Sequence, residues 1–187
     1  MASTNEAPPC PAVAPGTKVA VLLGSDSDLP VMQKCLDTLG DFGVPTAVHV
    51  MSAHRSPHVV AQYAARAEAQ GLEVLICAAG GAAHLAGAAA AHTTLPVLGV
   101  PVPSKHLAGV DSLYSTVQMP GGVPVATFAV GEAGAANAGL FAIQILARKE
   151  KGLRERLAAH KHKLACGVRE KDAALQAQLA AKAPRTR

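Results

Sequence analysis

The segment TAVHVMSAHRSPHVVAQYAARAEAQ (residues 46–70) decides the fold. It opens with a largely apolar run and passes into a helical pattern that starts at Pro57, a residue suited to the first turn of a helix. The turn between the two runs carries Ser52, His54 and Arg55. In open α/β sheets, ligands bind at the carboxyl edge of the strands. An imidazole beside a guanidinium in this turn therefore indicates a site, although a capped helix with two exposed neighbours is the simpler alternative.

Short β-like runs alternate with helical runs along the central part of the chain. We expect strands at Lys18–Leu23, Thr46–Met51, Glu73–Cys77, Pro96–Gly99 and Val123–Ala129, and helices at Leu29–Leu39, Pro57–Gln70, Ala82–His92, Val110–Val117 and Gly134–Lys149. Such alternation is typical of a parallel sheet covered on both faces. The prediction is a three-layer, flavodoxin-like (Rossmann-like) α/β fold with five parallel strands in the order 2-1-3-4-5 and an added C-terminal helix.

The composition excludes several classes of protein. Half of the residues are apolar, and the segment Val74–Ser104 has no charged side chain and is long enough to span a bilayer. That segment also contains Gly80-Gly81 and three prolines, so two buried strands around a small-residue helix explain it better than a membrane span. The four cysteines show no paired spacing, which is typical of reduced thiols in a cytoplasmic protein.

The two ends of the chain differ from its middle. Residues 1–16 are rich in Pro and Ala and lack the pattern of a secretory signal, so we expect a disordered lead-in before a catalytic domain at 17–149. Residues 148–187 hold 12 Lys/Arg against 4 Asp/Glu. We expect a basic amphipathic helix over 150–187, which Gly152 and Gly167 would break or bend. Its apolar stripe indicates docking on a neighbouring surface rather than binding to nucleic acid. The stripe consists of Leu153, Leu157, Leu164, Val168, Leu175 and Leu179.

Two loops at the predicted carboxyl edge carry groups that suit a phosphorylated sugar. Gly24–Asp28 offers backbone N–H groups and hydroxyls at a helix start, which favours a phosphate, and we expect Asp28 to accept hydrogen bonds from sugar hydroxyls. Taken alone, this stretch is more typical of a helix N-cap. In the second loop, Arg55 can grip a phosphate or carboxylate with two donors, and His54 can exchange protons near neutral pH.

Two further loops are expected at the same edge. Ala78–Leu85 has no bulky side chain before His84, so its backbone can approach a ligand closely; a histidine bonded in a polar pocket is the alternative for His84. Gly99–Ser104, followed by Ser112–Pro124, is expected to form a structured loop that closes the site or joins subunits. The other histidines lack the spacing of metal ligands, so we expect no metal site.

These loops together resemble the class I N5-carboxyaminoimidazole ribonucleotide mutases, the PurE family of de novo purine (IMP) synthesis. The resemblance runs from about Lys18 to Leu146. It rests on GSDSD (24–28), SAHR (52–55), AGGAAHL (79–85), LGVPV (98–102) and DSLYSTVQMPGGVPVAT (111–127). The related class II enzymes, which carboxylate aminoimidazole ribonucleotide directly with CO2, typically carry a lysine in place of Arg55 and lack the AGGAAHL run.

The resemblance implies an isomerase that moves a carboxylate from N5 to C4 of the imidazole ring without a cofactor or metal. His54 would be the general acid and base, Ser25 and Arg55 would lie near the phosphate, and Asp28 near the ribose. The substrate-binding set would be Ser25, Asp28, Ser52, Arg55, Gly80, Gly81 and His84, of which the last three would enclose the carboxylate or CO2. The family also implies a homo-octamer with sites at subunit interfaces.

Two other functions remain open on the same scaffold. One is another enzyme, either a carboxylase that uses CO2 directly or a nicotinate-nucleotide carboxylase, whose relatives usually carry an additional N-terminal domain. The other is a flavodoxin-like module that binds a flavin phosphate. Aromatic residues make up only 3% of the chain, which leaves few rings to sandwich a flavin and disfavours the second alternative.

Overall fold

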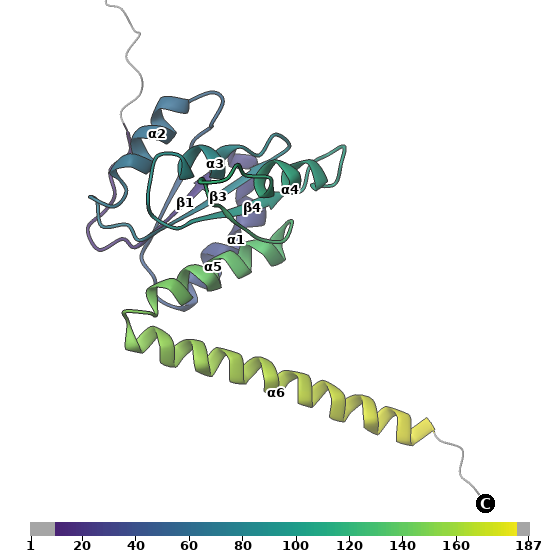
Figure 1. The fold of residues 1–187 in the computed structure, drawn as a ribbon. Helices are drawn as coiled ribbons and strands as arrows, with labels where there is room; N and C mark the ends of the chain where they lie inside the picture. The colour runs from purple at the N-terminus through teal and green to yellow at the C-terminus, as the bar shows by residue number, and fades with distance from the viewer. Residues whose placement is uncertain (1–9, 183–187) are drawn as a thin grey trace, which may run out of the picture. The chain divides into compact units, whose positions relative to one another are not determined.

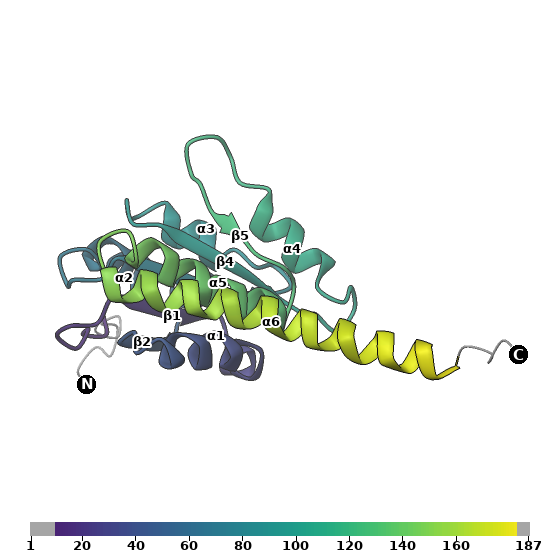
Figure 2. The same ribbon diagram turned by 90° about the horizontal axis from the view of Figure 1, so that it is seen from below.

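A parallel sheet forms the centre of the molecule. The structure is a computed structural model that describes residues 10–182, and its five strands pair in the order β2–β1–β3–β4–β5, all in parallel. The strands are β1 (Val19–Leu23), β2 (Thr46–Val50), β3 (Val74–Gly80), β4 (Val97–Val102) and β5 (Ala126–Thr127). The predicted flavodoxin-like fold and strand order are confirmed. The edge strands β2 and β5 lie on opposite sides of the sheet (Figure 2).

Helices cover both faces of this sheet. Figure 1 shows α1 and α5 on one face and α2, α3 and α4 on the other. The helices are η1 (Asp26–Asp28, one 3-10 turn), α1 (Leu29–Asp41), α2 (Pro57–Arg66), α3 (Leu85–Ala90), α4 (Val110–Val117) and α5 (Glu132–Leu146). Each of the first four parallel crossovers thus contains a helix, as right-handed β-α-β units require.

Burial explains why these residues form these strands. All five residues of β1 are buried, as are all six of β4, because layers of helix cover them on both sides. The edge strand β2 has no fully buried residue and leaves Val50 exposed. One core cluster joins Leu22 and Leu75 of the sheet to Tyr63 of α2 and Leu85 of α3. This cluster fixes the helices that begin at the carboxyl ends of β2 and β3.

Small residues let α5 pack closely against α1. A Cβ at Gly139 would lie 3.1 Å from the carbonyl oxygen of Cys35, so a larger side chain would push the two helices apart. A Cβ at Gly134 would collide with the carbonyl group of Ala129. The glycines of α5 are therefore packing residues, which explains a helix whose apolar residues are mostly small.

The structure corrects the predicted bounds of three strands, β3, β4 and β5. Residues 100–102 were expected in a loop, but they extend β4 and are buried. Pro101 fits there because β4 pairs with β5 only at Leu98 and Gly99, so the side of β4 that faces β5 needs no donor beyond them. The same short pairing reduces β5 to two residues instead of the expected seven. The glycine turn also starts later than expected, because β3 continues to Gly80.

The C-terminal part of the chain folds as a second unit. The residues up to Leu146 form one compact unit and those from Ala147 another. The second unit consists mainly of α6 (Lys151–Lys182), which continues through Gly167 without interruption. Leu153 is buried, whereas Leu164, Val168, Leu175 and Leu179 of the expected stripe are exposed. The predicted C-terminal helix is therefore present, with most of its apolar stripe open to solvent.

The expected N-terminal lead-in is described only from Cys10 onward. Residues 1–9 of the expected lead-in lie outside the described residues, while the side chains of Cys10 and Val13 pack against the core cluster.

The uncharged segment Val74–Ser104 contains β3, α3 and β4. Among residues 10–182, no helix has both the length and the apolar character needed to cross a membrane. All four cysteines are free thiols.

Candidate functional site

A cleft of about 620 Å³ opens at the carboxyl edge of the sheet, where the loops after β1, β2, β3 and β4 meet. This is the edge where open α/β sheets bind ligands, and the volume is that of a small-molecule site. Its lining is formed by Gly24, Ser25, Ser27, Asp28, Ser52, Ala53, His54, Arg55, Ala79, Gly80, Gly81, Ala82, Leu85, Pro103 and Ser104. The lining thus contains every residue of the expected site except His84, whose ring contacts the cleft residue His54.

The loop after β1 is a tight capping structure. The Ser25 N–H donates to Asp28 Oδ2 at 3.0 Å, and Ser25 Oγ accepts from the Ser27 N–H at 3.3 Å, so the two residues form a capping box around η1. Burial raises the pKa of the Asp28 carboxyl. The Gly24 N–H donates to the Ala78 carbonyl at 2.9 Å, which ties this loop to the end of β3. Asp28 therefore closes the capping box of η1 and also lines the cleft.

The loop after β2 is held by its own serines. Ser52 Oγ accepts from the N–H groups of His54 (3.3 Å) and Arg55 (3.2 Å), and Ser56 Oγ accepts from the Ser52 N–H at 2.9 Å. The Arg55 guanidinium makes two contacts at 3.5 Å, from Nε to Ser52 Oγ and from Nη2 to the Gly24 carbonyl. Both lie beyond the usual range of hydrogen-bond distances, so the donors of Arg55 remain available to a ligand.

His54 and His84 form a direct pair. His54 Nε2 lies 2.8 Å from His84 Nδ1, and the rings meet edge to face with centroids 5.0 Å apart. In such a contact one nitrogen carries the hydrogen and the other accepts it, so the tautomer of each ring depends on that of the other. The sequence predicted that both residues belong to the site, but it gave no sign of the bond between them.

His84 lines a second cavity. His84 was expected in the first turn of a helix that begins at Ala82, but α3 begins at Leu85, so His84 is its N-cap residue; it lines a cavity of about 360 Å³. The other lining residues are Gly87, Ala88, Tyr114, Ser115, Gln118 and Met119. The loop expected to close the site, Ser112–Pro124, thus contributes to this second cavity through α4 and its C-terminal end, and Figure 2 shows its remaining part projecting beyond the sheet between α4 and β5.

The glycine turn after β3 is anchored by Ser112 and Ser115, which lie in the segment expected to close the site or join subunits but were not predicted to bind this turn. Gly81 has a left-handed backbone with φ +67°, which favours glycine. Its N–H donates to Ser112 Oγ at 2.8 Å, and Ser115 Oγ donates to its carbonyl at 3.2 Å. Both hydroxyls come from α4, within the DSLYS segment (111–115). Their spacing along a helix was the available signal, but the sequence does not show which loop they reach.

The loop after β4 is fixed by a short bond between side chains. Ser104 Oγ donates to Asp111 Oδ1 at 2.6 Å and accepts from the Gly109 N–H at 3.2 Å. The Ser104 hydroxyl, as the largest influence, lowers the pKa of the Asp111 carboxyl. This carboxylate therefore holds the rim of the cleft at Ser104, where the backbone passes through left-handed residues at Ala108 and Gly109.

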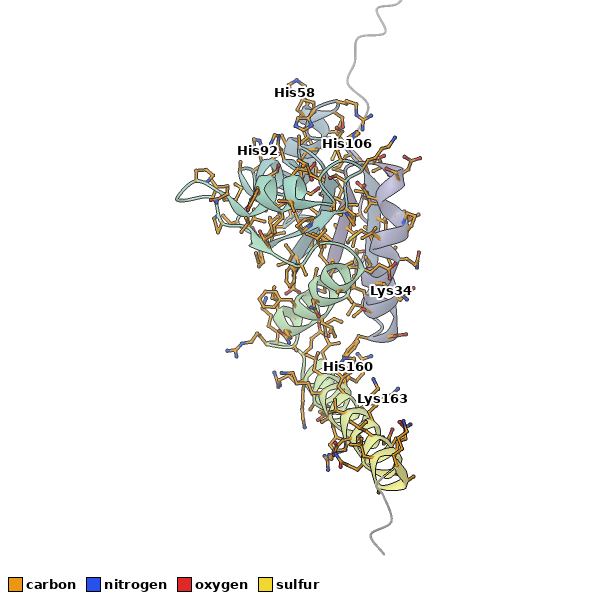
Figure 3. All side chains as sticks on the ribbon, turned by 90° about the vertical axis from the view of Figure 1, so that its right-hand side faces the viewer. Lys34, His58, His92, His106, His160 and Lys163 are labelled. Carbon is orange, nitrogen blue, oxygen red and sulfur yellow. The ribbon has the colours of Figure 1, made fainter. Side chains whose placement is uncertain are left out.

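Groups that could hold a metal ion are absent from residues 10–182, where no three His, Cys, Asp or Glu side chains gather at coordinating distance. Figure 3 shows His58, His92 and His106 at separate places around the sheet unit, and all three are exposed. In the second unit, His162 instead lies 3.6 Å from the thiol of Cys166 on the same helix.

Comparison with known proteins gives a consistent result. The AIR carboxylase family profile matches residues 18–166. A Vibrio vulnificus protein named N5-carboxyaminoimidazole ribonucleotide mutase is 55% identical over 76% of this chain and 88% of its own length, and a Synechocystis protein of the same name is 50% identical over 87% and 92%. Among solved structures, PurE of Treponema denticola superposes with a TM-score of 0.76 at 27% identity, covering 85% of this chain and 98% of its own. The chain is therefore a member of the AIR carboxylase family.

Proposed function

We propose that this protein is an N5-carboxyaminoimidazole ribonucleotide mutase, which moves the carboxylate of its substrate from N5 to C4 of the imidazole ring. The observation that carries the proposal is His54, which lines a cleft that also presents Arg55 and lies 2.8 Å from the ring of His84. A proton-transfer group, an anion-binding group and a loop of small residues are the parts that this reaction requires. Relatives that are 50–58% identical to this chain carry this name.

The cleft fits a ribonucleotide at three places. Arg55 is the one Lys or Arg among the described residues that line the cleft, so it is the natural partner of the phosphate, together with the Ser25 hydroxyl. Asp28 reaches the cleft between the first and third loops, where its carboxylate can accept a hydrogen bond from a ribose hydroxyl. Gly80 and Gly81 then form the wall beside the imidazole ring. Without Cβ atoms, this wall leaves room for a planar carboxylate.

The reaction balances with one shuttled proton. The N5–carboxylate bond of the carbamate breaks, N5 takes a proton, and CO2 is retained in the cleft. C4 of the ring then attacks CO2 to form the C–C bond, and the hydrogen on C4 leaves as a proton. In this proposal His54 gives the first proton and removes the second, so no net proton is consumed. Holding CO2 beside C4 turns the second step into an effectively intramolecular reaction.

A CO2-dependent carboxylase is the second candidate, because the matched family is described by that activity. The two functions differ in where the new carboxylate comes from. Carbon-13 NMR distinguishes them with purified protein in two samples. One contains N5-carboxyaminoimidazole ribonucleotide labelled in the carboxylate, and the other contains unlabelled aminoimidazole ribonucleotide with labelled bicarbonate. Label at C4 in the first sample alone is expected for a mutase, efficient labelling in the second means a carboxylase, and no labelling in either rejects both functions.

We further propose that the protein works as a homo-octamer in the cytoplasm, with sites completed at subunit interfaces. Helix α4 supports assembly with other subunits, because it leaves the apolar side chains of Val110, Tyr114 and Val117 exposed beside the second cavity, with Tyr114 60% exposed. Four free thiols agree with a reducing compartment. Light scattering after gel filtration would test the assembly: an octamer is expected, and a monomer with full activity would reject it.

A further inference from the structure

The turn that carries His84 is fixed from outside by helix α4. The Gly81 N–H donates to Ser112 Oγ at 2.8 Å, and the same hydroxyl donates to the Val102 carbonyl at 2.7 Å. Ser112 is fully buried, and its hydroxyl uses its donor and one acceptor position in these two bonds. A serine 31 residues further along the chain therefore joins the end of β4 to the glycine turn.

A second hydroxyl adds a weaker contact to the same peptide. Ser115 Oγ donates to the Asp111 carbonyl at 2.7 Å and lies 3.2 Å from the Gly81 carbonyl. Because a hydroxyl has one hydrogen, the bond to Gly81 is the longer branch of a shared bond. Both main-chain polar groups of Gly81 thus meet α4, and Ser112 makes the stronger contact.

The turn transmits this anchor to His84. The Ala83 N–H donates to the Gly81 carbonyl at 2.9 Å, and the His84 N–H donates to the Ala82 carbonyl at 2.9 Å. With Gly81 in the left-handed region, these short bonds leave little freedom between Gly81 and the first residue of α3. The position of Gly81 therefore sets the position of the His84 backbone, and the His84 ring contacts His54 at 2.8 Å.

We propose that Ser112, assisted by Ser115, is a positioning residue that keeps His84 bonded to His54. The proposal rests on the function proposed above, because it assumes that His54 transfers the proton. Serine suits this place because one small buried hydroxyl both accepts from Gly81 and donates to Val102. In Ser112→Ala, both main-chain groups lose their partner, and the turn is free to shift relative to His54. A shift of about 1 Å near the chemistry can lower a rate about 100-fold.

The test compares Ser112→Ala with Thr116→Val, one turn further along α4. Thr116 is also buried and its hydroxyl donates to the Ser112 carbonyl at 2.7 Å, but it has no bond to the glycine turn. We expect Ser112→Ala to lower kcat about 10- to 100-fold with KM changed less than about threefold, because the phosphate site is untouched. Thr116→Val should keep kcat within about twofold although it loses a similar hydrogen bond. Equal losses of kcat in both variants would overturn the proposal.

A readout without substrate separates this proposal from the proposed function. Nitrogen-15 NMR of histidine-labelled protein reports the tautomers of His54 and His84 through their ring shifts. We expect Ser112→Ala to change these shifts and Thr116→Val to leave them as in the wild type. Unchanged shifts in a folded Ser112→Ala protein would overturn the positioning role even if the wild type proved inactive as a mutase.

Ser115 provides the variant of choice if the buried Ser112→Ala protein does not fold. Ser115 is partly exposed, so Ser115→Ala should fold, lower kcat by about two- to tenfold and shift the same signals. Ser115→Thr keeps the hydroxyl and should restore both. Wild-type rates and shifts in Ser115→Ala, or no rescue by threonine, would contradict the proposal.

Discussion

Replacing Arg55 with alanine removes the group proposed to bind the phosphate, which is the one Lys or Arg among the described residues that line the cleft. The structure predicts a loss of ligand affinity with little loss of stability, because Arg55 makes only two long contacts, both at 3.5 Å, with the rest of the protein. Its remaining donors face no protein acceptor among the described residues. Truncation therefore leaves no strongly bonded partner behind in the free protein.

The size of the effect follows from the number of bonds. One hydrogen bond to a charged group contributes about 1.5–3 kcal/mol, and a guanidinium can make two parallel bonds to a phosphate. Even at the lower limit, two bonds amount to about 3 kcal/mol, which corresponds to a loss of affinity of roughly 100-fold. Arg55→Lys retains the charge but not the fork, so an intermediate loss of about tenfold is expected.

Isothermal titration of aminoimidazole ribonucleotide into each variant measures this directly. Arg66→Ala is the matched control, since Arg66 is exposed at the last residue of α2, the helix that follows the loop of Arg55. The control should bind as the wild type does, and all variants should unfold at similar temperatures. An affinity for the ribonucleotide that is unchanged in Arg55→Ala would show that the phosphate binds elsewhere and would refute this assignment.

Three further predictions concern catalysis, packing and pH. His54→Asn should lower kcat by about 10²- to 10⁴-fold, while the affinity for the ribonucleotide in titration stays near that of the wild type. His58→Asn, at an exposed histidine, is the control. Normal turnover in a folded His54→Asn protein would reject the proton-transfer role of His54. Gly134→Ala should destabilise the protein by more than about 3 kcal/mol in urea unfolding, because the new Cβ collides with the carbonyl group of Ala129. Gly167→Ala is the control: its Cβ would have nothing within 4 Å, so it should stabilise its helix by about 0.5–1 kcal/mol. Similar effects of the two substitutions would contradict the role of Gly134 in packing. Burial lowers the pKa of His49 below its ordinary 6.5, so as the pH falls the unfolded chain binds the proton before the folded protein does. The free energy of unfolding should therefore fall as the pH drops through about 6.5. In His49→Gln the free energy of unfolding should fall less over this range, and an unchanged pH dependence would show that His49 does not cause the fall.

The parts of the fold that depend on local pattern could be predicted from the sequence. Alternating strand and helix patterns gave the parallel sheet and its order, because consecutive β-α-β units have one handedness. The extension of β4 could not be predicted in this way. Val100 and Val102 favour a strand, but Pro101 between them indicates a loop. Pro101 fits a strand only because β5 ends early and leaves that side of β4 unpaired.

Some features of the candidate site could likewise be predicted from the sequence, and others could not. Ser52, His54 and Arg55 could be placed at the carboxyl edge because they follow a strand directly, and the cleft contains all three. The bond between His54 and His84 depends on two side-chain conformations in different loops, and the sequence does not determine those. Ser112 was missed for a related reason: it lies in a helix far along the chain, and only the packing of α4 brings its hydroxyl to Gly81.

A crystal structure with aminoimidazole ribonucleotide bound would test most directly whether this cleft is where the ribonucleotide reacts. We expect the phosphate within hydrogen-bonding distance of Ser25 and Arg55, and C4 of the imidazole ring facing His54. A ribonucleotide bound outside the cleft, or one whose C4 points away from His54, would contradict it.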